Sequence, residues 1–380
     1  MSNRKKKIAI VGSGNAGCIT ALNYGFHGDD IFDIDLYHDP NVNIERVGQG
    51  TTVSVVQLIS DALDIDWSNN PIKATLKSGI QYENWGKINH KFFHRFYMPT
   101  MSCHYVPNLL SKTVMESSYV NTIEKSINDP ESEIDADFIF DCRGKHKNEY
   151  EMYDTIVNPL NSVVLSRKEG KDLELHYTRC VATPDGWTFV IPNHDSVSYG
   201  YLYNNTITSK EDATANFVDM FDVVPDGDLT FKNYIAKNMW QGERTILNGN
   251  RFSFIEPLEA TSTAFYLRVA KVAWDHIVEG LSKEVCNDLI QSESKKLQQF
   301  ILWHYQNGSK FNTPFWDYAK QLAFNPDTAF QNHLKDAIDG SYLSINRSKY
   351  KEKEYGIWPR YSFKVWYDNV AKGDTNEKYN

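Results

Sequence analysis

The chain has 380 residues and a formal net charge of -9, from 40 Lys and Arg against 49 Asp and Glu. A chain of this length is too long for one small core and short for three full domains, so we expect two interleaved lobes. The negative balance offers no extended cationic surface for phosphate backbones, which argues against a nucleic-acid partner.

No apolar stretch is long enough to cross a bilayer, and the first apolar run is broken by Gly12, Gly14 and Gly17, unlike the core of a signal peptide. We therefore expect a soluble protein of the cytoplasm with no membrane partner. The five cysteines are odd in number and include no CxxC pair, which favours buried free thiols over a disulfide framework or a zinc site.

The first forty residues follow the pattern of a nucleotide-binding strand, turn and helix. The sequence predicts, in order, a strand at 8–11, a glycine-rich turn, a helix at 15–25 and a second strand at 33–37. Gly12 permits the sharp turn, Gly14 lets a pyrophosphate approach bare backbone, and Gly17 lets helix and strand pack closely. The first N–H groups of the helix favour phosphates. We predict a dinucleotide site that includes the turn residues Gly12, Gly14, Asn15, Ala16 and Gly17.

The adenosine end of this site departs from the usual pattern. The second strand should end in an acidic residue that holds the ribose hydroxyls, but His38 stands there and Asp39 follows it. An imidazole can hydrogen-bond a ribose hydroxyl, and Asp39 could take its place, so both stay open. The apolar run at 136–144, which contains Asp141 and Gly144, predicts a second strand beside the nucleotide or else an ordinary buried strand and turn.

Two segments that follow carry candidate functional groups. The loop NIERVGQGTT at 43–52 contains Gly48 and Gly50, and a loop without side chains can approach a planar cofactor closely. Lys77 lies in KSGIQYENW, and Lys73 precedes it by four residues. Taken alone, either lysine is most simply read as a surface residue.

Aromatic residues mark the next two segments. KFFHRFYMP at 91–99 contains His94 and Phe96, which an extended segment projects to one face, where they could sandwich an aromatic ring. Core packing is the equal alternative for this pair. GWTFVIP at 186–192 reads as an amphipathic strand whose aromatic residues belong to the core.

A turn and a strongly apolar helix follow in SFIEPLEATSTAFYLRVAKVAW. The turn contains Pro257, and the helix should begin near Thr261. The first N–H groups of this helix, at Thr261 and Ser262, would form an anion site without a cationic side chain. Glu259 stands just before them, and helix capping by its carboxylate is the plain interpretation.

The fold class that these patterns predict is α/β, with a Rossmann-like dinucleotide-binding module. The family resemblance given below implies that this module binds FAD and is interleaved with a mixed sheet. We expect this module at 1–265, with inserted substrate-side segments at about 53–130 and 150–240. A mainly helical region at 266–380 should cover the substrate and pack as one unit with the rest. Five tryptophans of the C-terminal third should close over the site: Trp274, Trp303, Trp316, Trp358 and Trp366.

In chain order, these segments resemble the motifs of the flavin-dependent tryptophan halogenases. The resemblance spans roughly 8–265 and implies a reaction. Reduced FAD (FADH2), supplied by a separate flavin reductase, would react with O2 and a halide to give hypohalous acid, HOX. Lys77 and Glu259 would then flank the spot where HOX meets an electron-rich, indole- or phenol-like substrate.

The resemblance also assigns roles to other residues. It implies flavin contacts from two motifs, the glycine loop and the WxWxIP-like strand: Gly48, Gln49, Gly50, Thr51, Trp187, Ile191 and Pro192. The backbone of Thr261 and Ser262 would hold the halide, and His94 and Phe96 would contact the substrate ring. In the family, the WxWxIP motif lies beside the flavin and keeps substrate away from it.

The chain departs from the family at four positions in these motifs. Gln49 stands where the GVGEAT-type loop has Glu, and Phe189 replaces the second Trp of WxWxIP. In the LESTG turn, Ala260 replaces Ser and Ser262 replaces Gly. A halide seat with fewer donors compensates the dehydration of chloride least, so we expect bromide or iodide to be preferred.

Two other classes of protein stay open at this point. A single-component flavin monooxygenase, a hydroxylase, would oxygenate its substrate directly and would not need Lys77. A non-enzymatic, flavin-binding redox sensor would need neither Lys77 nor a halide. The sequence leaves open the native substrate, the regiochemistry and whether the chain forms a homo-oligomer.

Overall fold

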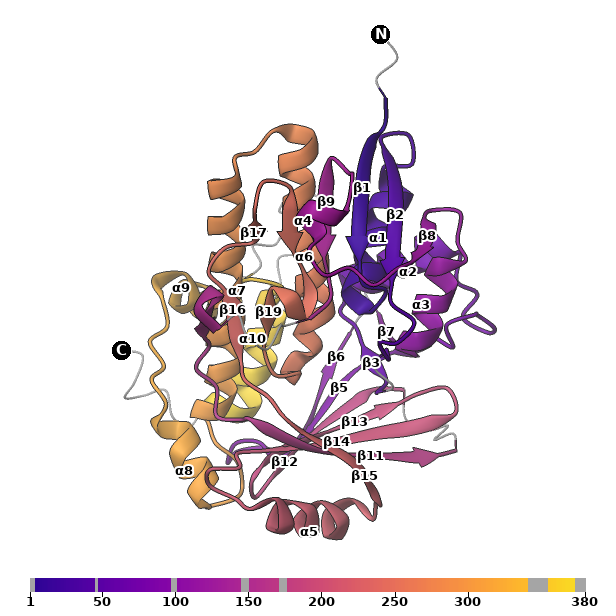
Figure 1. The fold of residues 1–380 in the computed structure, drawn as a ribbon. Helices are drawn as coiled ribbons and strands as arrows, with labels where there is room; N and C mark the ends of the chain where they lie inside the picture. The colour runs from indigo at the N-terminus through magenta and orange to yellow at the C-terminus, as the bar shows by residue number, and fades with distance from the viewer. Residues whose placement is uncertain are drawn as a thin grey trace. The chain divides into compact units, whose positions relative to one another are not determined.

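The computed structural model describes residues 4–44, 47–96, 101–144, 150–170, 176–340 and 355–372 (Figure 1). Parts of the expected motifs at 43–52 and 91–99 lie outside the described residues. The chain forms two compact units, and each of them is built from three stretches of sequence. The first unit comprises 1–77, 98–156 and 233–292, and the second comprises 78–97, 157–232 and 293–380.

The first unit is built around a six-stranded sheet in the order β17-β18-β9-β1-β2-β8. Five strands run parallel: β1 (Lys6–Val11), β2 (Phe32–His38), β8 (Asn121–Glu124), β9 (Phe138–Asp141) and β18 (Thr245–Leu247). The edge strand β17 (Trp240–Gln241) is antiparallel to β18. The chain thus reaches the sheet from three distant stretches of sequence, which is the interleaving that the sequence predicts.

Helices and two small sheets complete the first unit. The helices are α1 (Asn15–His27), α2 (Val53–Leu63), α3 (Pro107–Met115), α4 (Pro130–Glu133) and α6 (Thr261–Glu279), with short 3-10 turns η1 (Tyr150–Met152), η2 (Gly249–Arg251) and η3 (Leu258–Ala260). One small sheet has the order β3-β7-β4, from β3 (Gln49–Gly50), β7 (Ser102–Tyr105) and β4 (Thr75–Lys77). The other has the order β10-β16-β19, from β10 (Tyr153–Thr155), β16 (Tyr234–Ala236) and β19 (Ser253–Phe254).

The core of the first unit lies between the main sheet and α1 with α6. Ten consecutive residues of α1 are buried, so this helix has no solvent-facing stripe. The hydroxyl of Tyr24 in α1 donates to the carbonyl of Ala270 in α6 at 3.1 Å. The ring of Trp274, also in α6, packs on Tyr24 and Phe32 with centroids 5.2 and 5.1 Å away. Trp274 is half-buried and packs against the core of this unit.

The second unit contains a seven-stranded sheet in the order β15-β11-β14-β13-β12-β5-β6. Its strands are β5 (Gly79–Glu83), β6 (Lys91–Arg95), β11 (Ser162–Glu169), β12 (Thr178–Thr183), β13 (Gly186–Pro192), β14 (Ser196–Tyr203) and β15 (Pro225–Thr230). Only the pair β5 and β12 is parallel among them, so this is the mixed sheet of the predicted fold class. Helix α5 (Lys210–Phe221) packs on β11 and β14 through Phe217, Val164 and Tyr201.

Further helices belong to the second unit: α8 (Pro314–Gln321), α9 (Thr328–Ile338), α10 (Arg360–Trp366) and a π-helical turn at Tyr367–Ala371. Helix α7 (Lys283–Gln306) begins in the first unit and ends in the second. Aromatic rings join these helices, since Phe363 of α10 lies 5.5 Å from Trp303 of α7 and 5.1 Å from Phe330 of α9. Trp303, Trp316, Trp358 and Trp366 are all buried in this packing.

The structure confirms the predicted α/β class and the positions of its main elements. Helix α1 and strand β2 lie within two residues of their predicted bounds, and α6 begins at Thr261 as expected. The module boundary at 265 stays a prediction. No helix among the described residues is both long and apolar enough to span a bilayer.

Candidate active site

The glycine-rich turn has the shape that a dinucleotide pyrophosphate requires. Gly12 follows β1 with φ of 108°, a value that L side chains rarely adopt. A Cβ at Gly17 would lie 1.8 Å from the carbonyl oxygen of Gly12, so only glycine lets the helix approach the strand so closely. A Cβ at Gly14 would meet no described atom within 4 Å. The backbone at the start of α1 is therefore open, and FAD fits these residues.

A second turn borders this site, and the sequence analysis did not identify it. Asn248 and Gly249 follow β18, whose last residue aligns with the ends of β9 and β1. Gly249 has φ of 65°, and a Cβ there would lie 2.5 Å from the Cβ of Ala16. The Asn248 amide donates to Thr20 Oγ1 at 3.0 Å. The signal was the run NGN directly after an apolar strand, which reads as an ordinary turn until the parallel pairing is known.

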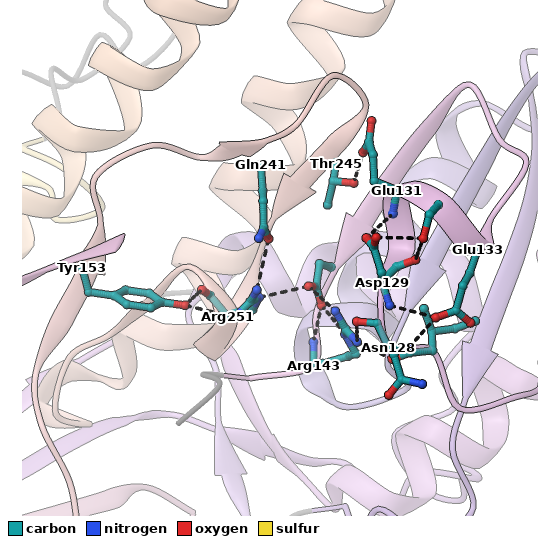
Figure 2. A network of polar contacts seen from close by, with 12 residues as sticks. Asn128, Asp129, Glu131, Glu133, Arg143, Tyr153, Gln241, Thr245 and Arg251 are labelled. Atoms are coloured by element: carbon teal, nitrogen blue, oxygen red, sulfur yellow. Dashed lines mark hydrogen bonds and ion pairs between the residues drawn. The ribbon is translucent and has the colours of Figure 1, made fainter. Parts of the chain in front are cut away.

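Figure 2 shows the polar network that contains Arg143 and Arg251, the two arginines that bind the carboxylate at the end of β9. Asp141 is fully buried, and its carboxylate accepts from Arg143 Nε and Nη2, both at 2.8 Å, and from Arg251 Nε at 3.0 Å. Arg251 Nη2 donates to Gln241 at 3.1 Å. Burial alone would raise the pKa of Asp141, but the bonds and charges of the two arginines hold it below its usual value. Asp141 therefore links the end of strand β9 to the turn η2 through Arg251.

A cavity of about 310 Å³ lies beside this ion-pair network. Its wall includes Glu131, whose carboxylate accepts from the backbone N–H groups of Glu243 and Arg244 at 3.1 Å and from the Thr245 hydroxyl. Glu131, Arg143 and Gln241 of the wall thus bond to the backbone or to other side chains of the network (Figure 2). We assign this cavity no role in catalysis.

The adenosine end keeps both of its predicted candidates. His38 is the last residue of β2, and its Nε2 lies 4.0 Å from the carboxylate of Glu124 at the end of β8. Asp39 is half-buried, and its Oδ1 accepts from the backbone N–H of Asn41 at 2.9 Å. This bond lowers the pKa of Asp39 and engages the carboxylate in the turn. Glu124, which the sequence analysis did not consider, supplies a second carboxylate at this edge.

One short strand, β7, contacts three predicted parts of the site: the glycine loop that contains Gly48 and Gly50, the glycine-rich turn at 12–17, called the phosphate turn below, and Lys77. On one side β7 pairs with β3, through Gly50 opposite His104. On the other side it pairs with β4, with Lys77 opposite Ser102. Because neighbouring strands are ~4.8 Å apart, β3 and β4 are about 10 Å apart across β7. Within the first unit, the predicted flavin loop and the predicted catalytic lysine therefore belong to one sheet.

Hydrogen bonds fix β7 to both of its neighbours. The hydroxyl of Tyr105 donates to Asn15 Oδ1 in the phosphate turn at 2.8 Å. The backbone N–H of Thr51 donates to the Cys103 carbonyl at 2.9 Å, and the hydroxyls of Thr51 and Ser102 are 2.6 Å apart. Alternate residues of a strand face opposite sides, so Tyr105 is directed to the nucleotide side while Ser102 shares the face of Lys77.

Lys77 is fully buried, unlike a surface lysine. His104 lies on the same face of the sheet, because it is two residues from Ser102, the residue opposite Lys77. His104 is also fully buried, and desolvation together with the charge of Lys77 lowers its pKa well below the usual value. Lys77 thus has a neutral imidazole as a neighbour in a site closed to water.

The buried imidazole of His104 predicts a pH dependence of stability. The unfolded chain takes up the proton near pH 6.5 while the folded chain does not, so stability should fall as the pH drops below 6.5. One proton of difference gives a slope of about 1.4 kcal/mol per pH unit. His104→Gln should flatten this slope in urea titrations between pH 5 and 7. His27→Gln is the control, because its ring is exposed and should leave the slope intact.

Glu259 lies on a strained turn just before α6. Glu259 has φ of 67° and Ala260 has φ of 53°, and neither is glycine. Left-handed backbone at two consecutive non-glycine residues costs free energy and concentrates at functional sites. Glu259 is 6% exposed, and Ala260 provides no side-chain cap for the first N–H groups of α6. The turn therefore presents a buried carboxylate next to an uncapped helix start.

The predicted substrate residues belong to the second unit. His94 of β6 and Phe96 contact each other edge to face, with ring centroids 5.5 Å apart. The sequence analysis expected them to sandwich a ring, but this contact leaves no room for one between them. His94 also contacts Tyr361, and its Nε2 is 3.2 Å from the Ser362 hydroxyl. A substrate ring would therefore pack on the pair, and its contact with the pair stays a prediction.

The WxWxIP-like motif forms strand β13 of the second unit. Trp187 and Phe189 lie on the same face of β13 with ring centroids 6.2 Å apart, and both are buried. Phe189 covers Gly200 of the neighbouring strand, where a Cβ would lie 2.1 Å from its ring. Glycine at 200 thus makes room for the ring that replaces the second Trp. The predicted position of this motif beside the flavin stays a prediction.

The phosphate turn and the second turn together define a dinucleotide-binding protein of the Rossmann-like class. The tryptophan halogenase family model matches residues 7–112 and 110–365, and the chain therefore belongs to the tryptophan halogenase family. This confirms the predicted family and the predicted enzyme class, a flavin-dependent halogenase. Neither alternative, the monooxygenase or the redox sensor, gains support from the comparisons.

Individual relatives are distant in sequence and close in fold. Tryptophan 7-halogenase RebH from Lentzea aerocolonigenes is 21% identical over 85% of this chain and 80% of its own length. Xcc4156, a flavin-dependent halogenase from Xanthomonas campestris, superimposes with a TM-score of 0.78 at 16% identity, over 98% of this chain and 89% of its own. A tryptophan halogenase from Shewanella frigidimarina gives 0.77 at 19% identity, over 97% and 89%.

Proposed function

We propose that this enzyme makes HOX from O2 and a halide with FADH2, and halogenates an electron-rich aromatic substrate, indole- or phenol-like, at Lys77 and Glu259. The observation that carries the proposal is the sheet β3-β7-β4, which holds the predicted flavin loop and a fully buried lysine on the two sides of one strand. A hydroxylase or a redox sensor has no use for a lysine buried there.

FAD would be held by the phosphate turn and the loops around it. The residues proposed to contact it are Gly12, Gly14, Asn15, Ala16, Gly17, His38, Gly48, Gln49, Gly50, Thr51, Trp187, Ile191 and Pro192. Bound in reduced form, it would supply two electrons to O2; the halide would supply the other two, and the two oxygen atoms would end in HOX and water. A separate flavin reductase would deliver it, and we place the enzyme in the cytoplasm together with that reductase.

Lys77 would act on HOX, and Glu259 would act on the aromatic ring. The Lys77 ammonium can donate a hydrogen bond to the oxygen of HOX and so polarise the bond between oxygen and halogen. The ring carbon then bonds to the halogen while Lys77 gives a proton to the departing oxygen, which leaves as water. The displaced ring proton passes to the Glu259 carboxylate and is returned to Lys77 to close the cycle. The balance is HOX plus aryl C–H giving aryl C–X plus water. His94 and Phe96 would orient the ring.

One assay tests this function. The protein is incubated with FAD, a flavin reductase, NADH and a halide against a panel of indoles and phenols, and the products are read by mass spectrometry. Halogenated products support the proposal. Hydroxylated products, or NADH consumption without any product, would replace it with one of the two alternatives.

The halide preference gives a separate prediction. Ala260 lacks the serine hydroxyl of the family's turn, whereas Ser262 adds a hydroxyl where the family has glycine. If the Ser262 hydroxyl does not replace the missing donor, the halide seat compensates dehydration less well than the family's turn. The affinity for chloride is reduced most, because chloride is the most strongly hydrated of the three anions. We therefore expect bromide or iodide products to exceed chloride products at equal concentrations of the three salts. Chloride as the main product would contradict this, and Ala260→Ser should shift the ratio towards chloride.

A further inference from the structure

Thr263 is a buried threonine whose hydroxyl has no hydrogen-bond partner among the described residues. The residue is 1% exposed and occupies the third position of α6. Buried hydroxyls are rarely left without a partner, and each exception calls for an explanation. A ligand that the hydroxyl contacts is one such explanation.

Other helical threonines of the first unit show what Thr263 lacks. Thr20 in α1 donates to the carbonyl of Ala16 at 2.7 Å, and Thr113 in α3 donates to the carbonyl of Leu109 at 2.8 Å. Both are the usual bond to the residue four positions earlier. For Thr263 that residue is Glu259, whose left-handed backbone turns its carbonyl out of the helical direction. The strained turn thus leaves this hydroxyl available.

The position of Thr263 directs its side chain towards the helix start. Side chains of an α-helix lean towards the N-terminus, and the third residue is the one whose side chain reaches back to the cap in a capping box. The cap residue here is Ala260, which has no side-chain oxygen to satisfy the N–H groups of Thr261 and Ser262. Two backbone donors and one hydroxyl therefore gather at the same end of α6.

We propose that the Thr263 hydroxyl is a third donor to the halide at the start of α6 and a determinant of halide selectivity. The inference rests on the proposed function and deepens it. In that function the halide is held only by the backbone N–H groups of Thr261 and Ser262, and the Thr263 hydroxyl is an additional donor. A hydroxyl can rotate to donate to an anion. The donor helps chloride most, because chloride has the largest hydration to replace.

The test compares Thr263→Val with Thr263→Ser in the FAD-loaded, full-length enzyme. Valine keeps the shape and removes the donor, so we expect KM for chloride to rise at least ~10-fold, KM for bromide to rise less, and kcat at saturating halide to change little. Serine restores the hydroxyl and should bring KM for chloride back to within about 3-fold of the parent value. Thr113→Val removes a helical hydroxyl far from this turn in sequence and should leave both KM values unchanged.

A second readout separates this inference from the proposed function. The melting temperature of the FAD-loaded protein is titrated with sodium chloride and sodium bromide against sodium gluconate, with no substrate present. Chloride should raise it in the parent and Thr263→Ser proteins but much less in Thr263→Val. Equal chloride responses in parent and Thr263→Val would overturn the inference, whether or not the enzyme halogenates. A parent protein that binds halide without making any halogenated product would instead refute the proposed function.

Discussion

Replacing Lys77 by alanine should abolish aryl halogenation while FAD still binds. The phosphate turn and the glycine loop do not depend on the lysine side chain, whereas the polarisation of HOX does. Loss of a positioned polarising group typically lowers the rate at least ~100-fold. The measurement is the yield of halogenated product per NADH consumed, beside FAD affinity from fluorescence quenching. HOX that escapes into solution should still chlorinate or brominate a free trap such as monochlorodimedone.

Controls are needed because Lys77 is fully buried and alanine would leave a cavity. Lys77→Met keeps the aliphatic stem without the charge and should show the same loss of activity with a smaller loss of stability. Lys73→Ala removes an exposed lysine four residues away and should leave product formation intact. Halogenation by Lys77→Met at the parent rate would show that the lysine serves packing alone.

Local sequence signals predicted the elements whose ends are marked by special residues. Gly12 and Gly17 fixed the turn between β1 and α1, because only glycine satisfies the φ of one and the close contact of the other. Pro257 and the apolar run after it located the start of α6 at Thr261. In each case the residues that define the element are adjacent in the chain, so their chemistry is readable without a structure.

Long-range pairings could not be predicted in this way. Strand β7 has four residues, SCHY, without polar alternation, yet it brings Gly50 and Lys77 into one sheet. The role of Asn248 and Gly249 depends on the pairing of β18 with β9, in which Thr245 lies opposite Ile139, 106 residues earlier in the chain. No local pattern encodes a pairing over that separation. The ion pair between Arg251 and Asp141 depends on the same strand pairing.

The edge-to-face contact of His94 with Phe96 shows a different limit of prediction from the sequence. Alternation along a strand correctly placed the two rings on one side. Alternation does not set the rotamers, and the rotamers decide whether two rings leave a gap or close it. Packing of Tyr361 against His94, from a helix more than two hundred residues later in the chain, is part of what closes it.

Replacing Glu259 by glutamine should sharply reduce turnover with little change in stability. Glutamine has nearly the same shape, so the substitution isolates the negative charge. If the carboxylate stabilises the cationic ring intermediate or accepts its proton, the halogenation rate should fall by ~100-fold or more. If it only interacts with the dipole of α6, the melting temperature should drop by an amount that corresponds to about 0.3–1 kcal/mol while the rate is kept.

The two outcomes are distinguished by measuring both quantities on the same protein. Single-turnover halogenation with chemically supplied FADH2 removes any effect on the reductase, and thermal unfolding of the FAD-loaded protein reports on the helix. Glu279→Gln changes an exposed carboxylate at the opposite end of the same helix and should leave the halogenation rate unchanged. The left-handed backbone at Glu259 favours the catalytic outcome, because strain at a buried carboxylate is maintained only where the surrounding structure imposes it.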